Sequence, residues 1–193
     1  VFHRSLGELV DYGLLLRPDD EYQITHALAH TYARQEAAPS AETIGRLALF
    51  YAELAQYASG QGLKGFAFLD HQRAHLVAVQ SAALAAQQWD AVRQIAWGAN
   101  TYLDLKGYWT ERVTVLQAGL NAARGAGDRY DEGAFSGELG NAYADLGETR
   151  RAIDYHERAL DVLRKIGDRR GEGAALGNLG NAYKNLGETR RAI

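Results

Sequence analysis

A 27-residue stretch, Gly127 to Ile153, recurs forty residues later as Gly167 to Ile193, and 20 of the 27 positions are identical. Both copies contain Gly-Asp-Arg, then Leu-Gly-Asn-Ala-Tyr, then Leu-Gly-Glu-Thr-Arg-Arg-Ala-Ile. Self-similarity at a period of roughly 20 to 50 residues is the signature of a solenoid, in which each unit packs on its neighbours. The repeat therefore constrains the architecture more than any other feature of this chain.

The composition favours helices and excludes several classes of protein. Only two prolines occur among 193 residues, and the hydrophobic content of 47% is typical of a folded soluble protein. A net charge of −3 provides no basic field for nucleic acid or an anionic membrane. The absence of cysteine excludes disulfides and cysteine-ligated zinc. We therefore expect an all-α, cytoplasmic protein without a membrane segment and without a nucleic-acid partner.

The forty-residue spacing also defines an older, diverged copy. Counting back from the clear copies predicts a helix pair formed by Trp97 to Leu105 and by Trp109 to about Arg124. The unit is then a first helix A, a Leu-Gly turn, a second helix B and a Gly-Asp-Arg turn, with glycine ending each helix. We expect repeats over residues 70–193, diverged in 70–126 and well formed in 127–193, with the last repeat lacking its helix B.

Helix A contains glycines at helical spacing, which is unusual. Each glycine costs about 0.5 to 1 kcal/mol relative to alanine, so we expect their missing side chains to let neighbouring helices approach closely. The expected positions are Gly133, Gly137 and Gly140, repeated at Gly173, Gly177 and Gly180. Because the chain stops inside a repeat, we also expect it to continue beyond both ends. Its last helices should then expose an apolar end at Leu179, Tyr183, Leu186 and Ile193.

These motifs closely resemble the tetratricopeptide repeat, in a forty-residue variant. The family's Leu-Gly-x-x-Tyr is Leu139 to Tyr143 and again Leu179 to Tyr183, and its helix B alanines correspond to Ala152 and Ala159. The resemblance implies a right-handed superhelical solenoid of antiparallel helix pairs. His156 falls where the family has a large residue in helix B, which implies a packed structural histidine.

The resemblance also implies a concave groove, lined by helix A residues, that binds extended peptides or protein surfaces. The register places six polar residues there: Asn141, Asp145, Asn178, Asn181, Lys184 and Asn185. An asparagine amide both donates to and accepts from a peptide backbone, although these positions would also suit plain solvation. The lysine of a carboxylate clamp would fall near Gly137 and Gly177, so a carboxylate-tail partner is not expected.

The residues before the repeats divide into two parts. In residues 1–37 we expect a helix from about Arg4 to Tyr12, a short β-hairpin across Pro18, and a helix from about Thr25 to Glu36. Residues 38–69 form a helical bridge, with a helix to about Ala58 and an irregular apolar plug at 66–69. Asp70 should then cap a helix that ends near Gln88.

The sequence from Leu9 to Leu15, the hairpin, and Thr25-His26-Ala27-Leu28 resemble the end of the winged-helix domain in NB-ARC and related STAND signalling NTPases. In that family a Met-His-Asp motif opens the last helix, and its histidine contacts the nucleotide's β-phosphate. His26 matches this histidine, whereas Thr25 and Ala27 replace the methionine and aspartate. A histidine that only bonds to its helix neighbours is the alternative. His30, His71 and His75 lack the further ligands of a metal site.

The leading hypothesis is the sensor region of a bacterial STAND-type signalling NTPase, with the repeats controlling an NTPase domain upstream in the same chain. The resemblance implies a protein or peptide trigger in the groove, ATP or ADP in the full-length protein, and a homo-oligomer on activation. The alternatives are a winged-helix transcriptional regulator and a plain interaction scaffold. No P-loop, nucleophile elbow or His-Glu-x-x-His motif occurs, so we expect neither enzymatic activity nor a cofactor in this part.

Overall fold

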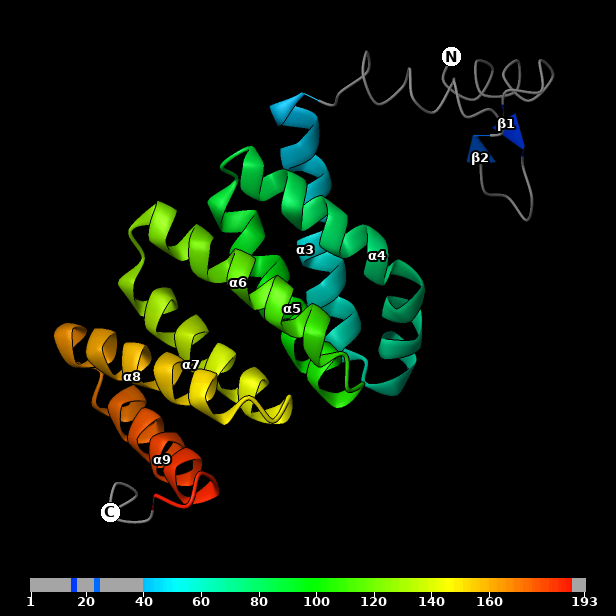
Figure 1. Ribbon diagram of the computed structural model, residues 1–193. Coiled ribbons are helices and arrows are strands. Elements are labelled where there is room, and N and C mark those ends of the chain that lie inside the picture. The colour runs from blue at the N-terminus through cyan, green and yellow to red at the C-terminus, as the bar shows by residue number, and fades with distance from the viewer. Residues whose placement is uncertain (1–14, 17–22, 25–39, 189–193) are drawn as a thin grey trace. The chain divides into compact units, whose positions relative to one another are not determined.

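The computed structural model describes residues 15–16, 23–24 and 40–188, which belong to two units, Val1–Ser40 and Ala41–Ile193. Within the described residues of the second unit there are seven helices (Figure 1). Their bounds are α3 Ala41–Gly60, α4 Leu63–Ala85, α5 Trp89–Leu105, α6 Trp109–Ala126, α7 Arg129–Asp145, α8 Thr149–Ile166 and α9 Arg169–Asn185.

The first unit is described only at two short strands. β1, Leu15–Leu16, pairs antiparallel with β2, Gln23–Ile24, and Leu15 lies opposite Ile24. These strands coincide with the two apolar runs predicted for the hairpin, but a two-residue pair does not by itself support a winged helix. The two predicted flanking helices and His26 lie outside the described residues, so the winged-helix module stays a prediction.

The second unit is built from helix pairs. Only two or three residues connect each helix to the next. Such short connections turn the chain back on itself, so consecutive helices pack antiparallel, and α3 also packs on α5 (Figure 1). The described part of this unit is therefore the all-α arrangement of helix pairs that the repeat predicts. The handedness of the superhelix stays a prediction.

The Gly-Asp-Arg turn has the same geometry in both copies. Gly167 has a φ of 77° and Gly127 a φ of 71°, and this left-handed conformation ends the preceding helix at little steric cost to glycine. Asp168 then caps α9, because its Oδ1 accepts a hydrogen bond of 3.0 Å from the backbone N–H of Gly171. Asp128 caps α7 in the same way. The repeated Gly-Asp turn thus sets the helix boundaries of each copy.

The same turn occurs forty residues before the first clear copy. Gln87 stands at the position of Gly127 and has a φ of 57°, the only positive φ of a non-glycine residue among the described residues. The backbone N–H of Gln88 bonds to the carbonyl of Ala83 at 2.9 Å, as that of Asp128 does to the carbonyl five residues before it. The backbone period therefore reaches back to the end of α4, although the sequence motif is gone.

The start of α4 corrects the prediction for the bridge. The expected irregular plug at 66–69 is helical, because Gly62, at a φ of 62°, turns the chain and α4 begins at Leu63. Phe66 and Leu69 lie three residues apart on one helical face and are 5% and 0% exposed. Asp70 accordingly lies inside α4 and not at its N-terminus.

The C-terminal helix corrects a second prediction. Leu179 is only 6% exposed and packs in a cluster with residues of α8 such as Ile153 and Leu160. Tyr183 and Leu186 are partly buried against the same cluster, and Ile193 lies outside the described residues. The predicted exposed apolar end is therefore wrong for Leu179, because these side chains occupy the face of α9 that turns toward α8.

The glycines of α7 do not share one role. A Cβ on Gly140 would lie 2.4 Å from the ring of His156, and a Cβ on Gly133 would lie 3.0 Å from Leu163. Close approach of α8 is therefore confirmed at these two positions. It is wrong for Gly137, where no described atom lies within 4 Å of such a Cβ, and Gly173 and Gly177 have no close described neighbour either.

Candidate functional site

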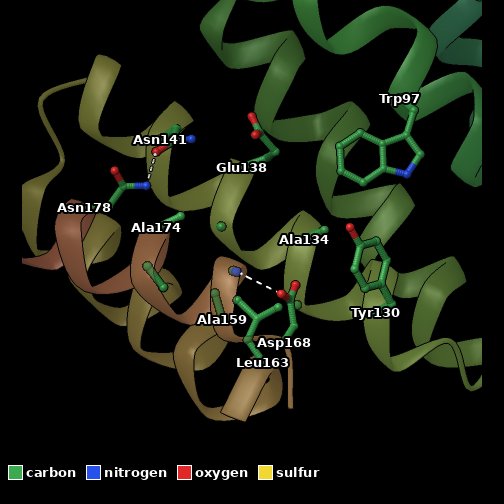
Figure 2. Close-up of a pocket in the computed structure, with 14 residues that line it drawn as sticks. Trp97, Tyr130, Ala134, Glu138, Asn141, Ala159, Leu163, Asp168, Ala174 and Asn178 are labelled. Carbon is green, nitrogen blue, oxygen red and sulfur yellow. Dashed lines mark hydrogen bonds between the residues drawn. The ribbon is translucent and has the colours of Figure 1, made fainter. Parts of the chain in front are cut away.

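The helix A residues of the last repeats border a hollow between α7 and α9, which we call the α7–α9 groove (Figure 2). Its volume is about 230 Å³. Small and aliphatic residues form its floor, two aromatic rings form one wall, and four polar residues form its rim. These are, in that order, Gly133, Ala134, Gly137, Ala159, Leu163, Gly171, Ala174 and Ala175; Trp97 and Tyr130; and Glu138, Asn141, Asp168 and Asn178.

The floor of the groove is open because both repeats have small residues at the positions that form it. Ala134 of α7 and Ala174 of α9 are forty residues apart, so the two helices present the same small side chain at equivalent positions. Gly137 lies one turn further along α7 and has open space where a side chain would be. The glycine that serves no packing purpose thus deepens the groove.

Trp97 of α5 forms the aromatic wall. Its ring stacks on Phe135 of α7 at a centroid distance of 4.3 Å, and its Nε1 donates a hydrogen bond of 3.2 Å to Asp131 Oδ1. Tyr130, at the start of α7, completes the wall and is 62% exposed. Trp97 also borders a second hollow of about 270 Å³ that includes Gln56 of α3. The indole is held in place and stands between two hollows.

Two of the six predicted groove residues meet in the α7–α9 groove. The Nδ2 of Asn178 donates a hydrogen bond of 3.1 Å to Oδ1 of Asn141, which joins α9 to α7 (Figure 2). The structure shows no partner for the Asn141 amide NH₂ or for the Asn178 carbonyl among the described residues. The NH₂ group of Asn141 and the carbonyl oxygen of Asn178 therefore remain free to donate to and accept from a peptide backbone.

The other predicted residues lie elsewhere. Asn181, Lys184 and Asn185 are exposed on α9 and do not line the groove. Asp145, at the end of α7, pairs with Arg112 of α6 at 2.9 Å. Helical spacing predicted that Asn181, Lys184 and Asn185 share a face of α9 with Asn178, but only the part of α9 that lies next to α7 borders the groove.

Arg112 is the centre of a polar network beside the groove. It is 4% exposed, and its Nε donates to Asn100 Oδ1 at 2.8 Å. Its Nη1 pairs with Asp104 at 2.6 Å and with Asp145, and its Nη2 pairs with Glu138 Oε2 at 2.9 Å. Burial, together with the nearby charges of Asp104 and Glu138, raises the pKa of Asp145 against the opposing effect of Arg112. The network ties α6 to α5 and α7.

Arg93 of α5 holds a second group of carboxylates. Its guanidinium pairs with Asp90, with Asp128 and, at 2.9 Å, with Asp131, the residue that also accepts the Trp97 hydrogen bond. The capping hydrogen bond from the backbone of Asp131 and the pairing with Arg93 lower the pKa of Asp128. The acidic first turn of α7 is thereby fixed next to the aromatic wall.

His156 has the packed position expected from its place in helix B. Its side chain is 2% exposed, contacts Gly140, and leaves Nδ1 buried without a hydrogen-bond partner. Burial lowers its pKa, with an opposing effect from Glu138. His71 and His75 are exposed on α4. Across the part of the chain that the structure describes, no group of three His, Cys, Asp or Glu side chains is arranged to hold a metal ion.

Comparison with known proteins bears on the last three helices. The tetratricopeptide repeat family model matches residues 131–193, which contain most of α7 and all of α8 and α9. This match, together with the antiparallel helices, supports a tetratricopeptide repeat array over these residues. No curated protein matches the chain. None of the described helices is long and apolar enough to cross a membrane.

Most of the groove residues escaped the sequence reasoning, among them Trp97, Tyr130 and Glu138. Each has an equivalent in a neighbouring tetratricopeptide unit, since Trp97 stands forty residues before Gly137, and Glu138 stands forty before Asn178. Carrying Asn178 back by forty residues would have found Glu138, whereas Trp97 and Tyr130 correspond to Gly137 and Arg170, which are not among the six predicted groove residues. For Arg112 no such signal exists, because the residue forty positions later is Ala152.

Proposed function

We propose that the α7–α9 groove binds an extended segment of a partner protein. Tetratricopeptide repeats suggest an interaction function, and the groove is the observation that supports this site. Its floor of small residues admits a chain, its aromatic wall offers apolar contact, and the Asn141–Asn178 pair keeps a free donor and acceptor at the rim. Paired backbone contacts and side-chain pockets are the usual means of binding extended peptides.

We further propose that this interaction serves signalling, in the sensor region of a STAND-type NTPase. The support is the order of two sequence resemblances, a winged-helix end at residues 9–28 followed by the repeat array. The proposal assigns ATP or ADP, the contact of His26 with nucleotide, and catalysis to the full-length protein with its upstream NTPase domain. It gives the present region no enzymatic role and no cofactor, and it places the protein in the cytoplasm.

The groove would control the NTPase by selecting one of two states. A trigger shifts a closed-to-open equilibrium only if it binds the open form more tightly, and moving the ratio from 1:99 to 99:1 needs roughly a 10⁴-fold preference. Release of the NTPase would then lead to homo-oligomer formation. Deleting the repeats from the longer protein should therefore raise nucleotide exchange and oligomerisation, and unchanged rates would contradict the signalling role.

Blocking the groove tests peptide binding directly. The substitution Gly137→Leu should fill the floor without disturbing the fold, since no described atom lies within 4 Å of the new Cβ. The matched control is Gly173→Leu, at an equally open helix A glycine outside the groove. Peptides selected from a random dodecapeptide display library on the unmodified chain should bind the control and lose affinity for Gly137→Leu. Equal binding to both variants, or no enrichment at all, would refute the proposal.

A further inference from the structure

Two clusters of charged side chains beside the α7–α9 groove contain more carboxylates than guanidiniums. Six carboxylates surround two guanidiniums, with Asp90, Asp128 and Asp131 on Arg93 and Asp104, Glu138 and Asp145 on Arg112. The Arg93 and Arg112 side chains are only 17% and 5% exposed, whereas Asp104 and Asp145 are 43% and 41% exposed. The positive charge is therefore buried, and the excess negative charge faces solvent.

The groove itself continues this imbalance. None of the residues that line it is Lys, Arg or His, and its rim contains the carboxylates of Glu138 and Asp168. Glu138 accepts hydrogen bonds from Arg112 and Asn100 through Oε2 alone, and the structure shows no partner for its Oε1 among the described residues. Asp168 is engaged as the cap of α9. Glu138 is thus the rim carboxylate with an oxygen available to a ligand.

The space next to Glu138 suits a long, thin side chain. Ala134 and Gly137 precede Glu138 on α7 and leave the floor flat, and the Trp97 ring borders the same stretch (Figure 2). Lysine and arginine bury their aliphatic stems along apolar surface while the charged head stays with an anion or with water. An acidic segment would instead meet the repulsion of the surrounding carboxylates.

We propose that the α7–α9 groove selects a lysine or arginine side chain of an extended partner segment. The cationic head pairs with Glu138 Oε1, and the aliphatic stem lies over Ala134 and Gly137 beside Trp97. This inference rests on the proposed peptide-binding function and adds the charge of the partner to it. The basis is charge complementarity, because the surplus carboxylates lower the energy of a bound cation and steer a basic segment to the groove.

The first experiment uses the unmodified chain and needs no variant. The dodecapeptides selected from the random display library should be enriched in Lys or Arg at one position. A selected peptide is then compared with its twin in which that residue is replaced by glutamine, using fluorescence anisotropy. The twin should bind about tenfold more weakly, as expected for loss of one charge-assisted hydrogen bond. Affinity for the basic peptide should also fall as salt is raised.

The second experiment identifies the carboxylate. The substitution Glu138→Gln keeps the shape of the side chain and should remove most of the difference between the two peptides. Glu53→Gln, on the exposed surface of α3, is the matched control and should leave that difference unchanged. Circular dichroism of both variants checks that the fold is retained.

Each outcome decides between the two proposals. Peptides that bind in a Gly137-dependent way but carry no Lys or Arg, or that prefer Glu or Asp, would overturn the charge selection and leave peptide binding intact. A basic peptide whose preference survives Glu138→Gln would overturn the assigned partner residue. Failure to enrich any groove-dependent peptide would refute both the proposed function and this inference.

Discussion

The α5–α6 pair and the α7–α8 pair have similar backbones but different interiors. In the first pair Arg112 and Asn100 face each other in a hydrogen-bonded network. Forty residues later the equivalent positions are Ala152 and Gly140, and the ring of His156 fills the space above the glycine. At this position the α5–α6 pair is joined by charged hydrogen bonds between side chains, whereas in the α7–α8 pair a histidine ring packs directly against a glycine.

This difference shows that side chains that contact one another in a repeat are replaced together from one copy to the next. A buried arginine is tolerated only where several acceptors satisfy it, and Arg112 finds them on α5 and α7. An asparagine at the position of Gly140 would collide with His156, so the two arrangements cannot be mixed residue by residue. The repeat fixes where helices begin and end, whereas the contents of each interface are chosen locally.

The largest expected effect comes from replacing Arg112 of α6 by alanine, the residue at the equivalent position 152 of α8. Arg112→Ala should destabilise the fold by about 3 kcal/mol, because it leaves Asp104, Glu138 and Asp145 without their shared counter-charge. This value is the lower end of the range for a broken buried pair, since two of the carboxylates are partly solvated. Urea unfolding followed by circular dichroism measures the change.

A control separates this loss from the removal of any arginine. Arg151→Ala breaks an exposed pair with Glu148 and a contact of the guanidinium with the Tyr143 ring, at 5.5 Å from its centroid, and should change stability by less than about 1 kcal/mol. Adding Asp145→Asn to the Arg112→Ala chain should recover part of the loss by removing one like charge. If the Arg112 and Arg151 variants were equally stable, the network would not hold the α5–α6 pair.

The next effect distinguishes two glycines of α7. Gly140→Ala should destabilise the fold by about 1 to 3 kcal/mol, because the added methyl group overlaps the His156 ring. Gly137→Ala should stabilise it by about 0.5 to 1 kcal/mol, because the helix gains propensity and no described atom lies near the new group. Thermal unfolding of the two variants gives the comparison, and changes of the same sign would contradict the packing described for α8.

The buried histidine of the α7–α8 pair gives it a pH dependence near neutral pH, and neither α5 nor α6 contains a histidine. Burial lowers the pKa of His156 in the folded state below its ordinary value of 6.5. As the pH falls below that value, the unfolded chain takes up a proton that the folded chain does not. Stability is therefore full above the ordinary pKa and decreases toward the lowered one.

The variant His156→Leu tests this pH dependence, since Leu116 stands forty residues earlier. The free energy of unfolding, measured by urea titration between pH of about 5.5 and 8, should depend less on pH in this variant. His75→Gln, on the exposed surface of α4, should retain the slope of the unmodified chain. An unchanged slope in His156→Leu would show that another group causes it.

The smallest expected effect concerns the turn at Gln87, which lacks the glycine of the later copies. Gln87→Gly should stabilise the fold by about 0.5 kcal/mol, because it removes roughly 1 kcal/mol of left-handed strain and adds a smaller entropy to the unfolded chain. The reciprocal Gly127→Gln should destabilise it by about the same amount. Chemical denaturation of both variants checks the pair, and a stability loss in Gln87→Gly would mean that the glutamine side chain has a packing role.

The fold could be predicted best where the repeat motif is clearest. The helix ends at Gly127 and Gly167, the helix pairs and the buried position of His156 could all be predicted, because turn glycines and helical spacing act locally. The start of α4 could not, since two phenylalanines near Gly62 suit both an irregular plug and a helical face. The helix end near Gln88 was predicted, but the left-handed conformation of Gln87 was not, because the glycine that marks this turn in the later copies is absent here.

The candidate site was predictable only in part, for a different reason. Asn141 and Asn178 were found from their equivalent faces, and both line the α7–α9 groove. Asn181, Lys184 and Asn185 were expected beside them but lie outside the groove, because only one stretch of α9 approaches α7. Spacing along one helix identifies a face, but it does not say how far the neighbouring helix covers it.

The sequence alone determined the period, the pairing of helices and the turns between them, because each depends on residues close together in the chain. Only the tertiary structure decided which side chains meet in the groove. Trp97, Glu138 and Asn178 come from three different helices, and their proximity depends on how those helices pack. The same holds for Arg112, whose burial depends on acceptors from two helices other than its own.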